Sequence, residues 1–233
     1  MKTFTILGTG WLGFELAKAF KDDYLMKVSS RNEEKIKMYE EEGFSSYILN
    51  ENKFDDYLGF LEKIYSHKKI KNIEKIIFIS STSIYPNIEG FFDEDFKIED
   101  SSSKIVFEAE NLVLNRSDII FRVSALVGAN RVSGRRLSNK VVEYPTSVIK
   151  FVHRNDVIDA TKFVIENNLN GTFNLCCKEH PSKEDLYSFN AKKYDFALPI
   201  FSENKEFLNR TIDGSKIEQL GFIYKHNNAF DLI

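Results

Sequence analysis

Residues 3–20, TFTILGTGWLGFELAKAF, combine a short apolar run, a glycine-rich turn and a segment with helical periodicity. A strand, a GxGxxG turn and a helix start in this order are the arrangement that a dinucleotide-binding site requires. Gly8 permits the tight turn, Gly10 lets a pyrophosphate approach the backbone, and Gly13 lets the helix pack closely on the strand. The N–H groups at the helix start, around Trp11 and Leu12, then face the phosphates. The stretch predicts a nucleotide site at the first strand–helix junction, and the alternative is a purely structural turn.

Strand and helix candidates alternate along the rest of the chain. Apolar, β-rich runs predict strands at 24–30, 44–50, 74–81, 118–128, 147–153 and 171–177. Helical periodicity predicts helices at 32–42, 53–70, 103–115 and 154–168. This alternation indicates an α/β fold, a Rossmann-type parallel sheet flanked by helices. We expect a nucleotide-binding core over residues 1–178, with cap insertions after residue 130, and a small mixed C-terminal cap over 179–233 that is not an independent domain.

Composition limits the function classes. The formal net charge of −3 gives no reason to expect nucleic acid as a partner. No apolar run is long enough to cross a bilayer and no signal sequence is evident, so we expect a cytoplasmic protein without a membrane partner. Cys176 and Cys177 are adjacent, which disfavours a disulfide between them, and we expect two buried thiols. The histidines lack partners at metal-ligand spacing, so no metal site is predicted.

The chain resembles the extended short-chain dehydrogenase/reductase superfamily, the group of NAD-dependent epimerases and dehydratases. The resemblance covers most of its length and follows the family order, in the segments GTGWLG (8–13), FISSTSIYP (78–86), EAENLVL (108–114), FRVSALVGANR (121–131), KFVHRNDVIDA (150–160) and GTFNLCCKEHPSKEDLY (171–187). It implies an NAD(P)-binding protein that oxidises, reduces, epimerises or dehydrates a small polar or nucleotide-sugar-like substrate. It also allows a homodimer as the assembly state.

The resemblance assigns site roles to the segment 80–85. Ser81, four residues before Tyr85, occupies the family position that hydrogen-bonds the reacting substrate group. Ser80 is placed beside the cofactor and Thr82 beside the substrate, and Tyr85 is the tyrosine of this motif that is able to offer a proton. The alternative is that these serines only end a strand and satisfy backbone groups locally.

The catalytic tyrosine–lysine pair of the family has no counterpart at its usual position. Counting back from Glu110 places Ser102 and Val106 where the two residues would stand, and Lys104 is out of register by two. Neither Ser102 nor Val106 can replace the tyrosine and the lysine of this pair. A non-catalytic nucleotide-binding or redox-sensing module therefore remains the alternative to an enzyme.

A second departure is the short interval between the strands predicted at 44–50 and 74–81. Relatives place a further strand and a cofactor-contacting loop there, whereas this chain has room for one helix. One central strand–helix unit is therefore expected to be missing.

The end of the second predicted strand bears on cofactor choice. NAD sites usually carry an acid there, whereas an arginine accommodates the 2′-phosphate of NADP. Ser30 and Arg31 follow the strand, and a guanidinium matches phosphate geometry. The sequence thus favours NADP, with NAD as the alternative; in the competing interpretation Arg31 pairs with Glu33 or Glu34.

Two further residues are substrate candidates through the resemblance. Arg131 belongs to the loop that covers nucleotide or sugar phosphates in relatives, and His153 belongs to a segment that borders the substrate pocket. We expect both to contact an anionic part of a small-molecule substrate.

Overall fold

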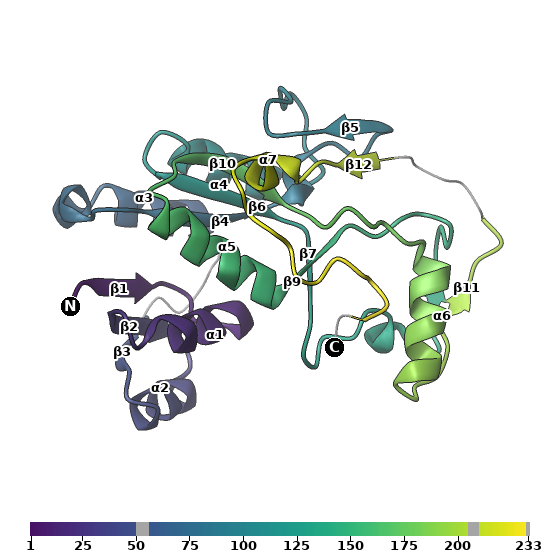
Figure 1. The fold of residues 1–233 in the computed structure, drawn as a ribbon, viewed down its shortest axis with the longest axis horizontal. Helices are drawn as coiled ribbons and strands as arrows, with labels where there is room; N and C mark the ends of the chain where they lie inside the picture. The colour runs from purple at the N-terminus through teal and green to yellow at the C-terminus, as the bar shows by residue number, and fades with distance from the viewer. Residues whose placement is uncertain (50–55, 205–209, 232–233) are drawn as a thin grey trace. The chain divides into compact units, whose positions relative to one another are not determined.

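The computed structural model describes residues 1–49, 56–204 and 210–231, and the chain divides into two units, residues 1–60 and 61–233. The first unit is a parallel three-stranded sheet of order β1-β2-β3 with two helices (Figure 1). Its elements are β1 (Thr3–Ile6), α1 (Trp11–Phe20), β2 (Leu25–Ser30), α2 (Glu33–Glu41) and β3 (Ser45–Ile48). α1 packs on β1 and β2 through Leu16, Ala17 and Phe20, while α2 packs on β2 and β3.

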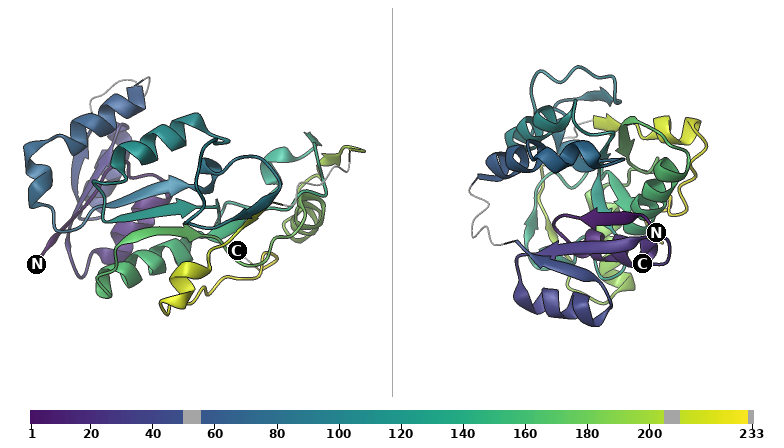
Figure 2. Two further views of the ribbon diagram at one scale, coloured as in Figure 1. Left: turned by 90° about the horizontal axis from the view of Figure 1, so that it is seen from above. Right: turned by 90° about the vertical axis from the view of Figure 1, so that its left-hand side faces the viewer.

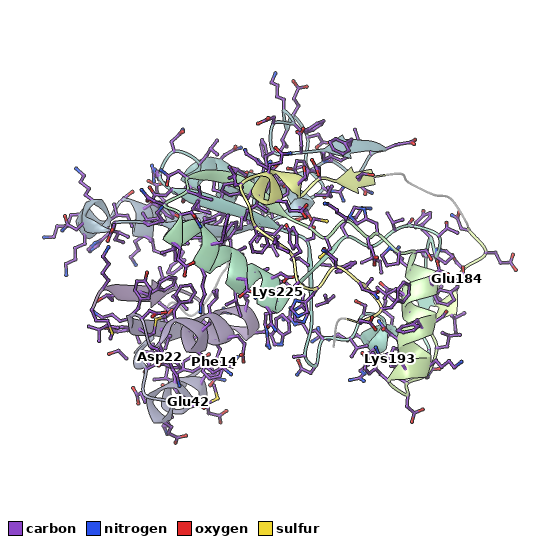
Figure 3. The ribbon with its side chains drawn as sticks, in the orientation of Figure 1. Phe14, Asp22, Glu42, Glu184, Lys193 and Lys225 are labelled. Carbon is purple, nitrogen blue, oxygen red and sulfur yellow. The ribbon has the colours of Figure 1, made fainter. Side chains whose placement is uncertain are left out.

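Local sequence signals explain these boundaries. Asn32 caps α2, since its Oδ1 accepts a hydrogen bond from the Lys35 N–H at 3.0 Å. Gly43, with φ of +85°, follows the helix in the left-handed conformation that glycine adopts without strain. Phe14, labelled in Figure 3, stacks on the buried Tyr39 at 5.1 Å between ring centroids and so joins the two helices. The strands and helices predicted up to residue 50 are confirmed within two residues, except that residue 50 lies outside the described part of the chain. The helix predicted at 53–70 ends at Tyr65, because a separate 3-10 helix follows over Lys68–Asn72, and its residues 53–55 lie outside the described part.

The second unit is built on a parallel sheet of order β10-β6-β4. The helices α4 and α5 lie on opposite faces of this sheet (Figure 2). The central strand β6 is buried throughout. The main elements are β4 (Ile77–Ser81), α4 (Lys104–Val113), β6 (Ile119–Val123), α5 (Arg154–Glu166) and β10 (Gly171–Leu175), preceded by α3 (Tyr57–Tyr65), which spans the boundary between the units, and by the 3-10 helix η2 (Lys68–Asn72).

Three two-stranded parallel pairs extend this unit. They pair β7 (Ala125–Val127) with β9 (Phe151–His153), β5 (Gly90–Phe92) with β12 (Arg210–Ile212), and β8 (Val141–Val142) with β11 (Ile200–Phe201). The remaining elements are the 3-10 helices η3 (Thr82–Ile84) and η4 (Arg135–Leu137) and the helices α6 (Lys183–Lys193) and α7 (Ser215–Gln219). Glu184 and Lys193 lie at opposite ends of α6 (Figure 3), which places each charge at the helix end that its sign stabilises.

The single strand predicted at 118–128 is two strands, because the chain changes pairing partner at Ser124. The Ser124 N–H donates to the Leu175 carbonyl at the end of β10, at 3.0 Å. The next N–H, that of Ala125, donates to the Lys150 carbonyl at 3.1 Å, just before β9. Periodicity alone does not reveal such a change, since both strands are apolar.

The strand orders agree with the absence of a central strand–helix unit. β1 is the terminal strand of the first sheet and β4 is the terminal strand of the second. Between residues 56 and 76 the described chain forms α3 and η2 and no strand. The expected α/β fold with a parallel sheet flanked by helices is confirmed, whereas the boundary at residue 178 between core and cap stays a prediction. Within the described ranges no helix has the length and apolar character needed to cross a membrane.

Candidate functional site

The turn between β1 and α1 has the backbone shape that each glycine was predicted to permit. Gly8 has φ of +79°, a left-handed conformation that side chains rarely adopt. The Gly10 N–H donates to the Gly8 carbonyl at 2.8 Å, which closes the turn. A Cβ atom on Gly13 would lie 3.1 Å from Cγ2 of Ile6, so the helix approaches the strand as closely as a glycine allows. A Cβ atom on Gly10 would meet only the Gly8 oxygen, at 3.9 Å, so the space in front of Gly10 is open on the side of the turn.

Side chains from β2 and α2 hold this turn in place. The Gly8 N–H donates to Oγ of Ser29 at 3.0 Å, and the Thr9 N–H donates to the Ser29 carbonyl at 2.9 Å. The Tyr39 hydroxyl donates to the Thr9 carbonyl at 2.6 Å from a fully buried position. Sequence reasoning missed Ser29 and Tyr39 as positioning residues. The turn is therefore pre-formed, since its shape is fixed by hydrogen bonds within the first unit.

The N-terminus of α1 suits an anion. Gly10 stands at the N-cap and carries no capping side chain, and the first turn of the helix holds no acidic residue. Trp11 and Leu12, which begin the helix, are half-buried. The partial positive charge of the helix start is thus not neutralised by a carboxylate of the first turn, as phosphate binding at such a position requires.

The end of β2 carries the residues predicted to choose the cofactor. Ser30 is buried, and its Oγ accepts a hydrogen bond from the Asn32 N–H at 3.1 Å. Arg31 is exposed directly after the strand. No acid stands at residues 29–31, so the strand end lacks the residue type that binds ribose hydroxyls in NAD sites.

Ser80 and Ser81, the last two residues of β4 in the second unit, lie in different environments. Ser80 is buried and its hydroxyl donates to Oε2 of Glu110 at 2.6 Å. Ser81 is half-buried, and its Oγ accepts hydrogen bonds from the N–H and the hydroxyl of Ser83, at 3.2 and 3.0 Å. The Ser81 hydroxyl proton remains available to a ligand oxygen. The Ser80 hydroxyl is committed to the carboxylate, so contact with a cofactor would require its backbone.

Tyr85 belongs to a buried polar network. Its side chain is 0% exposed, and its hydroxyl accepts from Nη1 of Arg122 at 2.8 Å and lies 2.8 Å from Oδ1 of Asn174. Arg122 in turn forms a buried ion pair with Glu110, at 2.6 Å between Nη2 and Oε1. Burial raises the pKa of Tyr85 to about 12. Both the burial and the raised pKa weaken the case for Tyr85 as a proton donor and favour a structural role.

The two residues at the positions of the missing catalytic pair have structural contacts of their own. The Ser102 hydroxyl donates to the Ser83 carbonyl at 2.7 Å. Val106 packs against the apolar cluster around Ile84 and Phe92. Lys104 is exposed and lies 3.6 Å from Glu108 on the same helix. The site thus offers no tyrosine–lysine pair at this place.

A row of small polar side chains crosses the carboxyl edge of the second sheet. Thr82, Ser124 and Cys176 each follow the last residue of a strand, β4, β6 and β10 respectively, and all three are buried. Oγ1 of Thr82 lies 3.4 Å from Oγ of Ser124, and a hydrogen bond from Ser124 reaches the Cys176 thiol. Ligands of open α/β sheets bind at this edge. Sequence analysis found Thr82 and missed the other two, because the change of partner at Ser124 was not visible.

The remaining predicted substrate residues are His153, the last residue of β9, and Arg131, on the loop after β7. His153 is buried, accepts a hydrogen bond from the Asn155 N–H through Nδ1, and stacks on His226 at 3.8 Å between ring centroids. Arg131 is exposed, and its N–H donates to the Gly128 carbonyl at 3.0 Å. A Cβ atom on Gly128 would collide with the His153 ring, so this glycine brings the two loops together. No group of three or more His, Cys, Asp or Glu side chains in the described ranges could hold a metal ion.

Comparison with known proteins gives one class of fold. No family model matches the chain. The protein YeeZ of Escherichia coli K12 is 26% identical over an alignment of 265 positions that covers 97% of both chains. This alignment is longer than the 233 residues of the chain, so it contains positions of YeeZ that have no counterpart here. The gaps support a missing internal segment.

Several solved structures superpose on nearly the whole chain. A putative NAD-dependent epimerase/dehydratase from Methylobacillus flagellatus superposes with a TM-score of 0.74 at 18% identity, over 97% of this chain and 94% of the other. UDP-glucuronic acid 4-epimerase from Bacillus cereus in complex with NAD gives 0.71 at 18% identity, over 98% and 96%. The human epimerase family protein SDR39U1 with NADPH gives 0.73 at 12% identity, over 98% and 97%. The chain therefore has the same α/β fold as these epimerase and dehydratase structures.

Proposed function

We propose that the chain binds a nicotinamide dinucleotide at the turn between β1 and α1 and transforms a small polar or nucleotide-sugar-like substrate by oxidoreduction. The turn is the observation that carries the proposal. It combines a left-handed Gly8, an open space before Gly10 and a helix start without an acidic cap. Solved structures of the same fold hold NAD or NADPH, which supports this class of cofactor.

A thermal shift assay tests the proposal directly. A ligand present at 100 times its dissociation constant adds about 2.7 kcal/mol to the free energy of unfolding. For a chain of this size we expect the unfolding temperature to rise by about 5 to 10 °C with the preferred coenzyme. The absence of a shift with both NADPH and NADH would refute it.

We further propose that NADP is preferred to NAD. Ser30 and Arg31 would hold the 2′-phosphate, since Arg31 is exposed directly after β2 and no acid competes for the ribose at that place. The variant Arg31→Asp should lose affinity for NADPH by about tenfold or more, because charge-assisted hydrogen bonds contribute about 1.5–3 kcal/mol. Lys35→Asp, an equal charge change on exposed α2, is the control. NADPH binding that Arg31→Asp leaves intact would contradict the assignment.

In the proposed reaction, the side chains at the end of β4 orient the substrate. When bound, the nicotinamide would supply or accept a hydride at C4. Ser81 would donate its free hydroxyl proton to the reacting oxygen, and Thr82, Arg131 and His153 would contact the rest of the substrate. We expect Ser81→Ala to lower kcat/KM by about 100-fold, the effect of removing one donor to a developing oxyanion. Ser66→Ala, at an exposed serine directly after α3, should leave it unchanged.

One observation favours a second candidate, a nucleotide-binding module without catalysis. Ser102 and Val106 replace the tyrosine–lysine pair, and Tyr85 is buried. Consumption of NADPH absorbance with a panel of carbonyl compounds and nucleotide sugars separates the two functions. Tight NADPH binding without turnover on any substrate would favour the module.

A further inference from the structure

Two cations, Lys150 and Arg210, lie at the carboxyl edge of the second sheet. Lys150 directly precedes β9, and Arg210 begins β12. Both side chains are half-buried. In the described part of the chain neither forms an ion pair with an acidic residue, and Nε of Arg210, although buried, has no hydrogen-bond partner. Burying a charge without a counter-charge is costly, so such an arrangement calls for an anion from outside the chain.

The backbone fixes Arg210 above the end of β4. Its Nη2 donates to the Thr82 carbonyl at 2.9 Å and to the Tyr85 carbonyl at 3.2 Å, so the guanidinium spans η3. The guanidinium carbon also lies 5.8 Å from the centre of the Phe92 ring. These contacts hold the plane of the guanidinium and leave Nε to bind a ligand.

Lys150 lies near the end of β10. Its Nζ donates to the Val148 carbonyl at 3.3 Å. Burial, with the neighbouring charges of Arg210 and Lys183, lowers the pKa of Lys150 to about 8, while the Cys176 thiol acts in the opposite direction. The backbone places Lys150 beside the polar row, since its carbonyl accepts a hydrogen bond from the N–H of Ala125, the residue after Ser124, and the carbonyl of the next residue, Phe151, accepts one from the N–H of Cys177. The charges of Arg210 and Cys176 both act on its ammonium group. His180 also lies beside the polar row, since its Nε2 is 3.4 Å from the Cys176 sulfur. Burial lowers the pKa of His180, and the charge of Lys150 contributes to this in a smaller degree.

We propose that Lys150 and Arg210 form a subsite for an anionic group of the substrate, a carboxylate or a phosphate. The inference rests on the proposed function, whose substrate class it narrows to molecules with a negative charge. The anion would sit between the two cations, above the hydroxyl groups of Thr82 and Ser124. Its charge would offset the mutual repulsion of Lys150 and Arg210, which no side chain in the described ranges does.

Calorimetric titration with malonate and with inorganic phosphate, without coenzyme, tests the subsite. We expect saturable binding of at least one of these anions by the wild-type chain, and the stronger of the two identifies a carboxylate or a phosphate as the preferred group. Lys150→Met should weaken this binding about tenfold or more. Lys150→Arg, which keeps the charge, should retain most of it. Lys97→Met is the matched control, because Lys97 is exposed and pairs with Glu99.

Each outcome decides the matter. No saturable anion binding, or an equal loss in Lys150→Met and Lys97→Met, overturns the subsite. Arg31→Asp, a change in the first unit, should leave anion affinity unchanged, and a parallel loss there would assign the binding to the coenzyme site instead. Anion binding by a chain that binds no NADPH would refute the proposed function and leave the subsite standing. NADPH binding without anion binding would do the reverse.

Discussion

A methyl group at Gly10 should separate coenzyme binding from stability. A Cβ atom at this position would meet only the Gly8 oxygen, at 3.9 Å, which is an ordinary van der Waals contact. The backbone of Gly10 has φ of −100° and ψ of −149°, so it does not adopt the left-handed conformation that Gly8 adopts. We therefore expect Gly10→Ala to change the free energy of unfolding by less than about 1 kcal/mol.

The same methyl group would fill the space through which a pyrophosphate reaches the backbone. Losing one charge-assisted hydrogen bond from an amide to phosphate costs about 1.5–3 kcal/mol, which corresponds to a weakening of roughly 10- to 150-fold in NADPH affinity. Titration calorimetry measures the affinity, and urea denaturation of the same samples measures the stability. NADPH affinity that Gly10→Ala leaves within about twofold of wild type would refute the reasoning.

The neighbouring glycines provide internal controls. Gly8 has a positive φ, so Gly8→Ala should cost about 1–2 kcal/mol of stability through backbone strain alone. Gly13→Ala would bring its methyl group within 3.1 Å of Ile6, and the helix would have to shift slightly from the strand. Three substitutions of the same size should thus give three different combinations of affinity and stability.

Three further predictions concern the second unit. Glu110→Gln removes the carboxylate charge that pairs with the buried Arg122 at 2.6 Å, and we expect the free energy of unfolding in urea to fall by about 3–5 kcal/mol. The half-exposed Glu108→Gln should cost less than about 1 kcal/mol, and a loss below about 1 kcal/mol for Glu110→Gln would contradict the network. Tyr85→Phe removes the hydroxyl that hydrogen-bonds Nη1 of Arg122 and Oδ1 of Asn174, and it should cost about 1–3 kcal/mol of stability. Any turnover of NADPH should stay within about twofold, and a drop in turnover larger than the drop in folded fraction would make Tyr85 the proton donor after all. Burial lowers the pKa of Lys150 from its ordinary value of 10.5 to about 8, so anion affinity should fall above pH 8. The free energy of unfolding without ligand should rise between pH 8 and 10.5 relative to Lys150→Met, because the unfolded chain binds more protons in this range. An anion affinity independent of pH between about 7 and 9 would exclude Lys150 from the subsite.

The local elements could be predicted from the sequence because their signals are local. The glycine turn at 8–13 and the helices predicted at 32–42 and 154–168 each depend on residues within a few positions of one another, and the structure has these helices at Glu33–Glu41 and Arg154–Glu166. β12 could not be predicted, since Arg210 pairs with Gly90 far away in the chain and the three residues involved carry no strand pattern.

The candidate site was visible only in part for the same reason. Ser81 and Thr82 belong to a recognisable motif. Lys150 and Arg210 are candidates for an anion subsite only because the fold partly buries both side chains and brings them close together. Tyr85 was an attractive proton donor in the sequence, but its hydroxyl is enclosed by Arg122 and Asn174, which come from two other strands. Contacts between residues that are far apart in the sequence leave no local sequence pattern from which the site could be predicted.

The change of strand partner at Ser124 ties two parts of the second unit through adjacent peptide groups. The N–H of Ser124 binds the carbonyl of Leu175 at the carboxyl end of β10, and the N–H of Ala125 binds the carbonyl of the half-buried Lys150. A substitution that tilts the peptide groups of Ser124 and Ala125 would move Cys176 and Lys150 together, without replacing Cys176 or Lys150 themselves. Selection for a new substrate should therefore yield changes at positions 124 and 125, where the ligand is tuned through the main chain.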